Sequence, residues 1–319
     1  MGDIYDSAFR TLLNDCRQLV IPIINEIFGE SYTGDEKIEF FPNEHFLDQQ
    51  DESDKKRITD TNFRITGKTT KKYHLECESS YPDGKITIRL FEYDAQIALD
   101  ESQVTEETLT VTFPNTAVLY LRTRKKTPDK MKYMIITPGG TVQYDIPIMK
   151  VQSYSLDNIF EKRLLMLIPF YIFSHEDRFQ EYEDNTQKLE KLKAEYNNIL
   201  ERLDILERKE KIGGFDKRTI IEISSDVIRE ITQKYENVQK GIGDIMVGAL
   251  IETETRKIWN EAAEKAAEKA AKETALRLLQ IGKLTTEEVA IGSGLTVEEV
   301  KKLEKMATAI PLALDGGLR

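Results

Sequence analysis

A stretch of strict alternation at residues 72–78 constrains the fold more than any other part of the chain. Its sequence is KYHLECE, and one face of an extended strand would carry Tyr73, Leu75 and Cys77. The opposite face would carry Lys72, His74, Glu76 and Glu78. Because side chains of a β-strand alternate between its two faces, the pattern predicts a strand with an apolar back and an acidic front.

The residues before this strand supply a second one. The run RITDTNFRITG, residues 57–67, reads as a strand that ends at Gly67. A short connection there predicts an antiparallel pair that brings Asp60 beside Glu76 and Glu78. Hard divalent ions such as Mg²⁺ prefer carboxylate oxygens, so clustered carboxylates indicate a metal site. The alternative is a solvated strand face with ordinary surface charge, and spacing alone leaves both interpretations open.

Length, charge and cysteine content set broad limits. With 319 residues and 40% hydrophobic content, the chain can bury a core of one compact domain plus an extension. A net charge of -11 argues against indiscriminate binding to nucleic acid, so DNA would have to be bound through local basic patches. Cys16 and Cys77 lie in apolar patterns, which predicts buried free thiols in a reducing compartment.

Neither a leader nor a membrane span is apparent in the sequence. The first residues, MGDIYDSAF, lack a basic region followed by an apolar core. The longest apolar run, residues 164–173, is too short to cross a bilayer. We therefore expect a cytoplasmic protein without a membrane partner.

Two helices are expected on either side of the paired strands in the chain. Residues 6–28 have apolar side chains at helical spacing, and Pro22 should kink or split that helix. Glu26 lies near its end, where a solvated helix position is the simplest interpretation. A strand is expected at residues 37–46, and residues 86–99 show the second helical pattern.

The second helix carries a polar stripe. Arg89, Tyr93 and Gln96 stand at i, i+4 and i+7 and therefore share one helix face. Such a set beside carboxylates could bind a phosphate. In the alternative interpretation, Tyr93 is a packing residue and Arg89 is its exposed neighbour.

Residues 109–122, LTVTFPNTAVLYLR, form the most strand-like run in the chain. Positions 117–121 are apolar on both faces, which is typical of a central strand. The densest basic cluster follows, formed by Arg122, Arg124, Lys125, Lys126 and Lys130. It could follow a DNA backbone or be a solvated loop. Residues 131–137 and 141–146 predict a hairpin, and residues 157–173 a buried helix bent at Pro169.

From residue 176 the composition changes to that of a helical arm. Apolar residues at intervals of three and four form two seams, at residues 189–206 and 228–249, which predict a coiled-coil-like helical hairpin. Because such seams are narrow, we expect them to pair with each other and to form a homodimer. Two capping boxes, Thr285 with Glu288 and Thr296 with Glu299, predict a small helix-turn-helix-like tail.

Several segments together resemble one known family. They are LVIPIINEIFGE, NEHF, RITDTNF, YHLECES, IRLFEYDAQIAL, PFYIF and GLTVEEV. The expected order of elements, helix, strand, Asp-bearing strand, Glu-bearing strand, helix and strand, is similar to that of the PD-(D/E)XK nuclease fold, and the set of segments resembles bacterial recombination-promoting nucleases and transposase-like proteins. The resemblance implies an α/β fold with a restriction-endonuclease-like mixed sheet flanked by helices. It divides the chain into a nuclease-like domain at residues 1–175, the helical arm at 176–281 and the tail at 282–319.

The resemblance also implies an activity. It is Mg²⁺-dependent hydrolysis of DNA phosphodiester bonds, with Mn²⁺ as an alternative ion. Asp60, Glu76 and Glu78 would form the metal and catalytic site, joined by Glu26 of the first helix. Lys72 shares the face of Glu76 and would serve as a displaced catalytic lysine.

The chain departs from the family at Glu78. That position, two residues after Glu76, usually holds Lys or Gln in the family, so we expect impaired catalysis. The alternative function is a non-catalytic protein that tethers DNA or assembles through its helical arm.

Overall fold

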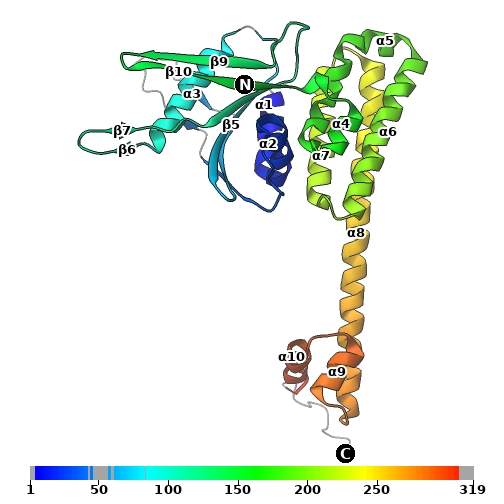
Figure 1. Cartoon of the computed structure of the whole chain (residues 1–319). Helices are drawn as coiled ribbons and strands as arrows, with labels where there is room; N and C mark the ends of the chain where they lie inside the picture. Colours follow the sequence, from blue (N-terminus) through cyan, green and yellow to red (C-terminus); the bar gives the residue numbers. More distant parts are fainter. Residues whose placement is uncertain (1–3, 42–43, 46–56, 59–60, 83, 309–319) are drawn as a thin grey trace, which may run out of the picture. The chain divides into compact units, whose positions relative to one another are not determined.

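A six-stranded mixed sheet forms the centre of the first part of the chain (Figure 1). The computed structural model describes residues 4–41, 44–45, 57–58, 61–82 and 84–308. The sheet has the strand order β1 (Lys37–Phe40), β4 (Thr61–Thr66), β5 (Thr70–Glu78), β8 (Asn115–Tyr120), β10 (Gly140–Lys150) and β9 (Lys130–Thr137). Two small ribbons accompany it, β2 (Glu44–His45) with β3 (Arg57–Ile58) and β6 (Gln103–Val104) with β7 (Leu109–Thr110).

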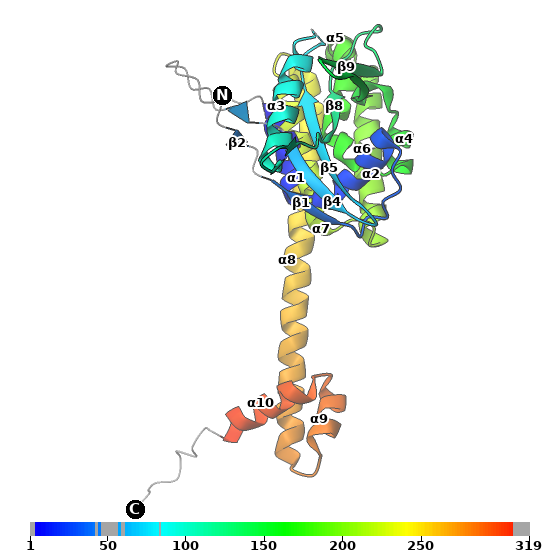
Figure 2. The same ribbon diagram turned by 60° about the vertical axis from the view of Figure 1, so that its left-hand side comes forward.

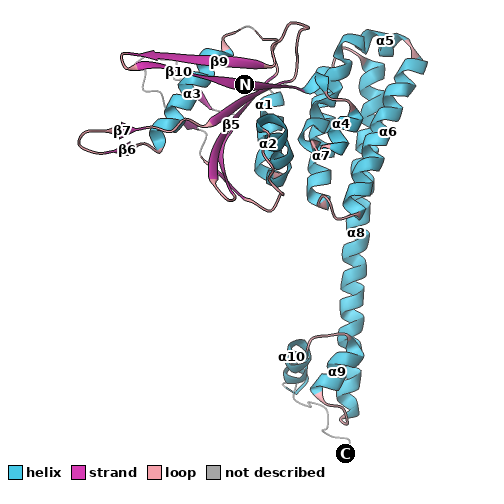
Figure 3. Ribbon diagram, viewed as in Figure 1, coloured by secondary structure: helices cyan, strands magenta, loops and turns pink. Residues whose placement is uncertain are grey.

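The strand directions follow from the connections. Strands β1, β4 and β5 are antiparallel neighbours, as are β10 and β9. The β5–β8 pair is parallel because α3 (Ile86–Asp100) lies between the two strands in the chain and returns it to the same end of the sheet. The predicted pairing of the two strands around Gly67, the central strand and the hairpin of β9 and β10 are thus confirmed (Figure 3).

Helices cover both faces of the sheet (Figure 2). The apolar face of β5, formed by Tyr73, Leu75 and Cys77, belongs to the same core as α1 (Ile4–Asp15) and α2 (Val20–Phe28). On the opposite face, Leu90 of α3 packs with Val118 and Tyr120 of β8. The alternation predicted for β5 is therefore correct, but its polar face lies largely beneath a helix instead of facing solvent. Both cysteines are buried free thiols, as predicted.

The kink in the first helical region falls at another place than predicted. The break lies at Cys16, followed by a short 3-10 turn at Arg17–Leu19 (η1), and Pro22 is in the first turn of α2. Proline is tolerated there because the first N–H groups of a helix have no intrahelical acceptor. The helical region is split, as the prediction allowed, but the break is at Cys16 and not at Pro22.

The single helix predicted at residues 157–173 is two elements. A short helix, α4 (Leu156–Glu161), is followed by a long 3-10 segment, η3 (Leu165–Arg178), which contains Pro169. Between them Arg163 is left-handed, with φ 57°. Its N–H donates to the Phe160 carbonyl and the Leu164 N–H donates to the Ile159 carbonyl, so α4 ends in a Schellman motif.

The same motif ends α6 (Thr186–Arg208). Glu210 has φ 54°, its N–H donates to the Glu207 carbonyl, and the Lys211 N–H donates to the Leu206 carbonyl. Arg163 and Glu210 are the non-glycine residues with positive φ in the described chain. Left-handed backbone costs a residue with a Cβ roughly 1–2 kcal/mol, so glycine would be favoured at both positions.

The helical region is part of the main core and not a free hairpin. It comprises α5 (Phe179–Asp184), α6, α7 (Gly214–Ile231) and the first part of α8 (Glu236–Ile281). The first seam is buried within the chain, with Leu192 and Tyr196 each 1% exposed and Ile199 and Leu203 fully buried. The second predicted seam is divided between α7 and α8 by a turn at residues 232–235.

By contacts, the chain forms two compact units, Met1–Leu250 and Ile251–Arg319. In the second unit, the end of α8 packs with α9 (Thr286–Ser293) and α10 (Val297–Thr308) around Ala275, Val289 and Val300. The capping box of Thr285 and Glu288 is confirmed, and Thr296 and Glu299 exchange the same hydrogen bonds. Among the described residues, no helix combines the length and apolar character that crossing a membrane requires.

Candidate functional site

Two carboxylates of β5 lie on the face of the sheet that α3 covers. Glu76 is 3% exposed, and the side chain of Glu78 is 17% exposed. In the parallel pair with β8, Glu76 is opposite Val118 and Glu78 is opposite Tyr120. One carboxylate is therefore inside the protein, and the second lies nearer to solvent at the end of the strand.

One nitrogen of Arg89 holds both carboxylates. Its Nη2 atom lies 2.9 Å from Oε1 of Glu76 and 2.9 Å from Oε2 of Glu78. Burial disfavours the charged guanidinium, but the two carboxylates outweigh it and raise the pKa of Arg89. The carboxylates thus converge on one point, and a positive charge from α3 occupies it.

A buried histidine and aspartate lie beside Glu76. Nδ1 of His74 is 2.7 Å from Oδ1 of Asp94, and that oxygen also accepts a hydrogen bond of 2.6 Å from Oγ1 of Thr116. Nε2 of His74 is 3.5 Å from Oε2 of Glu76, which is a charge contact more than a good hydrogen bond. Burial lowers the pKa of His74, but Asp94 and Glu76 outweigh it and raise the pKa to about 9. The imidazole is therefore positively charged at neutral pH.

Unsatisfied polar atoms surround these groups. In the described structure Nε of Arg89, Oδ2 of Asp94 and Oδ1 of Asn62 are buried without a hydrogen-bond partner. Asn62 of β4 pairs with His74 of β5, so its side chain lies on the same face of the sheet as His74 and Glu76. Each such atom costs about 1–3 kcal/mol. Their concentration at one place is typical of a functional site more than of a purely structural core.

Lys72 is engaged elsewhere. Its Nζ atom lies 2.8 Å from Oε2 of Glu101 and 3.4 Å from the Ile97 carbonyl, at the far end of α3. Four residues of strand separate it from Glu76, roughly 13 Å at the usual rise. The structure therefore pairs Lys72 with Glu101 and not with Glu76.

Two further predicted metal ligands have different outcomes. Asp60 lies outside the described residues; its neighbour in the sequence, Thr61, pairs with Leu75. Glu26 belongs to α2, which packs on the other face of the sheet from α3. Its Oε1 atom accepts hydrogen bonds from Lys162 at 2.6 Å and from the Tyr154 hydroxyl at 3.1 Å. Glu26 is thus not brought together with Glu76.

The predicted polar stripe of α3 is only partly brought to the carboxylates. Arg89 reaches them, whereas Tyr93 is 5% exposed and its ring centre lies 6.1 Å from the His74 ring centre in an edge-to-face arrangement. Gln96 donates a hydrogen bond of 2.9 Å to Asp100. Tyr93 therefore contributes to the buried surroundings of His74, and Gln96 lies apart.

The basic segment after β8 adjoins the end of β5. Arg122 donates to the Ser79 carbonyl at 2.8 Å and forms a two-bond pair with Glu176, at 2.7 and 2.8 Å. The guanidinium of Arg124 lies 5.1 Å from the ring centre of Tyr81. Lys125 and Lys126 are exposed. Arg122 thus has a structural role, and the other three residues present positive charge near Glu78.

Asp94 was not among the residues predicted from the sequence. Its position in the sequence indicates a buried side chain, because Asp94 lies in the apolar stripe of α3 between Leu90 and Ile97, at helical spacing from both. A charged residue in such a stripe must find a buried partner, which here is His74. From the sequence, His74 on the polar face of the strand is either a general base or a hydrogen-bonded surface histidine, and the structure instead buries it against Asp94.

The described residues contain no group of three or more histidines, cysteines or acids arranged to hold a metal ion. Glu76 and Glu78 nevertheless offer the hard oxygen donors that Mg²⁺ prefers, at the point now occupied by Arg89. Searches against protein-family models, curated proteins and solved structures find no match for this chain.

Proposed function

We propose that this chain is a Mg²⁺-dependent endonuclease that hydrolyses phosphodiester bonds in DNA and has the PD-(D/E)XK architecture. The order of elements supports this proposal. Helices α1 and α2 are followed by β1, β4, β5, α3 and β8, with the two helical layers on opposite faces of the sheet. When only the strands of the six-stranded sheet are considered, this order is similar to the one that the resemblance implies, helix, three strands, helix and strand.

The convergence of Glu76 and Glu78 on one nitrogen of Arg89 carries the proposal. Burying a carboxylate such as Glu76 is costly, and a structural role alone would be served as well by apolar residues. Two carboxylates aimed at one point provide a place for a cation. Their location at the end of β5, partly open to solvent through Glu78 and Arg89, gives a substrate access.

Glu76 and Glu78, together with Asp60 outside the described residues, would hold the ion in this proposal. Bound Mg²⁺ would supply Lewis acidity and lower the pKa of a bound water molecule. Arg89, whose side chain is 40% exposed, would release the carboxylates and donate two hydrogen bonds to phosphate oxygens. His74 would keep its positive charge beside Glu76 and hold that carboxylate in place.

DNA would be bound through local positive charge, because the chain as a whole carries -11. Arg124, Lys125 and Lys126 supply it beside the end of β5. Contacts of this kind position a phosphate backbone without reading its sequence.

A plasmid-nicking assay tests the proposal. We expect cleavage of supercoiled DNA with Mg²⁺ or Mn²⁺, none with a chelator, and none for Glu76→Gln. The matched control is Glu101→Gln, which removes an acid that pairs with Lys72 at the other end of α3 and should retain activity. Circular dichroism of each variant controls for folding. Cleavage that persists in the chelator or in Glu76→Gln would refute the proposal, as would the absence of cleavage with either ion.

The second candidate is a non-catalytic assembly or DNA-tethering module that acts as a homodimer. It is favoured by α8, on which Ile251, Ile258 and Trp259 are 62%, 63% and 72% exposed. Large apolar side chains exposed along one helix are typical of a surface that binds a partner. Sedimentation of the parent protein and of Ile258→Asp tests it, because loss of a dimer in the variant is expected. A parent protein that sediments as a monomer at micromolar concentration would contradict it.

A further inference from the structure

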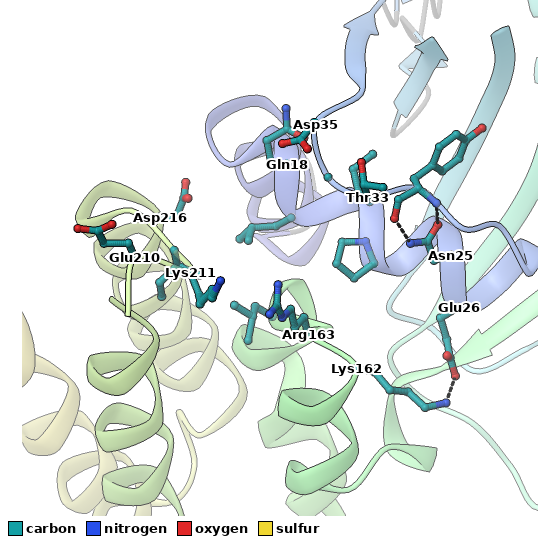
Figure 4. A pocket seen from close by; sticks show the side chains of 17 residues that line it. Gln18, Asn25, Glu26, Thr33, Asp35, Lys162, Arg163, Glu210, Lys211 and Asp216 are labelled. Carbon is teal, nitrogen blue, oxygen red and sulfur yellow. Dashed lines mark hydrogen bonds and ion pairs between the residues drawn. The ribbon is translucent and has the colours of Figure 1, made fainter. Parts of the chain in front are cut away.

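A cavity lies in the first unit on the side of α2, across the sheet from Glu76 (Figure 4). Its volume is about 560 Å³, and small-molecule sites usually measure about 300–1,000 Å³. Residues of α2 and the turn after it, of the turn after α4, and of the turn between α6 and α7 line it. Buried apolar side chains contribute to its wall, namely Leu19, Ile21, Leu165 and Ile212.

Two positive charges face this cavity without a partner. Arg163 and Lys211 line it, and neither side chain makes a hydrogen bond or an ion pair within the described part of the chain. In Figure 4 both extend toward the open space. Lys162, by contrast, is neutralised by Glu26 at 2.6 Å. Two adjacent unpaired cations repel each other and favour the binding of an anion.

Two acidic residues of the lining, Glu210 and Asp216, are directed elsewhere. The carboxylates of Glu210 and Asp216 extend away from the centre of the cavity in Figure 4. Burial is the largest cause that raises the pKa of the Cys16 thiol to about 12, and the negative charge of Asp216 is the second. The Asp216 carboxylate therefore interacts with that thiol. With Glu26 paired with Lys162, the positive charges of Arg163 and Lys211 remain at the cavity, and Asp35 is the other acid of its lining.

The backbone at Arg163 adds a separate observation. Arg163 is the left-handed residue of the Schellman motif that ends α4, a position at which glycine would avoid the steric cost of a Cβ. The arginine removes that advantage and places a guanidinium at the cavity.

We propose that the cavity binds a small phosphomonoester. A phosphate monoester carries a charge of about -1.5 to -2 at neutral pH, which the charges of Arg163 and Lys211 match. The planar guanidinium of Arg163 donates two hydrogen bonds to phosphate oxygens, and Lys211 supplies a point charge. The organic part of the ligand lies against the apolar wall formed by Ile21, Leu165 and Ile212. This site is independent of the proposed nuclease site.

Calorimetric titration of the full chain with adenosine 5′-monophosphate tests the proposal, with adenosine and inorganic phosphate as comparison ligands. We expect the monophosphate to bind at least tenfold more tightly than either comparison ligand, and Lys211→Gln to weaken it at least tenfold. Binding should also weaken below about pH 6, where the phosphate takes up its second proton.

Two glycine substitutions at the left-handed positions separate binding from folding. Arg163→Gly removes the strain and the cation, so it should raise the melting temperature and abolish binding. Glu210→Gly removes the same strain without removing a cation, so it should raise the melting temperature and retain binding. Equal affinity of Arg163→Gly and the parent would overturn the proposal, and so would adenosine binding as tightly as its monophosphate. Inorganic phosphate binding as tightly as the monophosphate would overturn the assignment of an organic ester.

Discussion

Arg89 occupies the point at which Glu76 and Glu78 converge, so its removal should show whether the two carboxylates bind a metal ion there. In Arg89→Ala, Glu76 loses a charged partner at a buried position. A hydrogen bond to a charged group contributes about 1.5–3 kcal/mol. The contact with Glu78 contributes less, about 0–1 kcal/mol, because the Arg89 side chain is 40% exposed and screened by solvent. We therefore expect the free energy of unfolding to fall by about 2–3 kcal/mol without added metal.

The same contacts determine the response to metal. An ion that binds Glu76 and Glu78 in the parent protein must first displace Arg89, whereas in Arg89→Ala the carboxylates are available. A difference of about 2–3 kcal/mol in binding free energy means that Arg89→Ala should bind the ion roughly 30- to 150-fold more tightly than the parent protein. A ligand at about 100 times its dissociation constant stabilises a protein by about 2.7 kcal/mol. Mg²⁺ should therefore restore most of the stability that Arg89→Ala loses.

Thermal unfolding with and without Mg²⁺ measures both effects. For a unit of this size, a loss of about 2–3 kcal/mol lowers the melting temperature by about 4–12 °C. Arg124→Ala is the matched control, since it removes an arginine that stacks on Tyr81 and touches neither carboxylate. The reasoning would be refuted if Mg²⁺ stabilised Arg89→Ala no more than it stabilises the parent and the control.

Three further outcomes follow from other contacts. The pKa of His74 is raised to about 9 from an ordinary 6.5. The stabilisation of the folded protein by the charged His74 should therefore be present below pH 6.5 and be lost as pH rises through about 9. Urea unfolding in the presence of a chelator should show that the free energy of unfolding falls by on the order of 3 kcal/mol as pH rises through this range. His74→Gln should not show this fall, and an equal fall in that variant would contradict the role of His74. Glu78→Gln should lower Mg²⁺-dependent cleavage by on the order of 100-fold, because a neutral amide replaces a carboxylate that holds the ion; cleavage equal to or above that of the parent would show that Glu78 is not a working ligand. Leu192→Asp, at a position 1% exposed, should unfold the first unit in a thermal melt, whereas Val247→Asp, at a position of the same unit that is 48% exposed, should change the stability of that unit by less than about 0.5 kcal/mol; a folded Leu192→Asp would contradict the internal packing of α6.

The sequence alone was sufficient for the features that depend on neighbouring residues. Alternation defined the two faces of β5, the apolar run identified β8 as central, and Gly139 and Gly140 marked the turn between β9 and β10. The pair of Thr285 and Glu288 identified the start of α9. In each case the interaction spans a few residues along the chain, so the pattern itself contains the geometry.

Only the tertiary structure decided how the site is assembled. Residue spacing placed Arg89 and Glu76 on separate elements, but the packing of α3 on the sheet put one nitrogen 2.9 Å from each carboxylate. It also buried His74 against Asp94, so that a strand face expected to meet solvent became a charged interior. Lys72, on that same strand face, was instead paired with Glu101.

The helical region gives the same lesson at a larger scale. Its apolar seam predicted pairing between helices, but a seam does not specify its partner, and in the folded chain the seam of α6 is buried in the core that also contains α1 and α2. Likewise, the end of α4 at Arg163 was invisible because the residue is unfavourable in a left-handed conformation. Periodicity along a chain determines which face of an element is apolar. Which element covers that face depends on contacts between residues far apart in sequence, and those contacts exist only after the chain has folded.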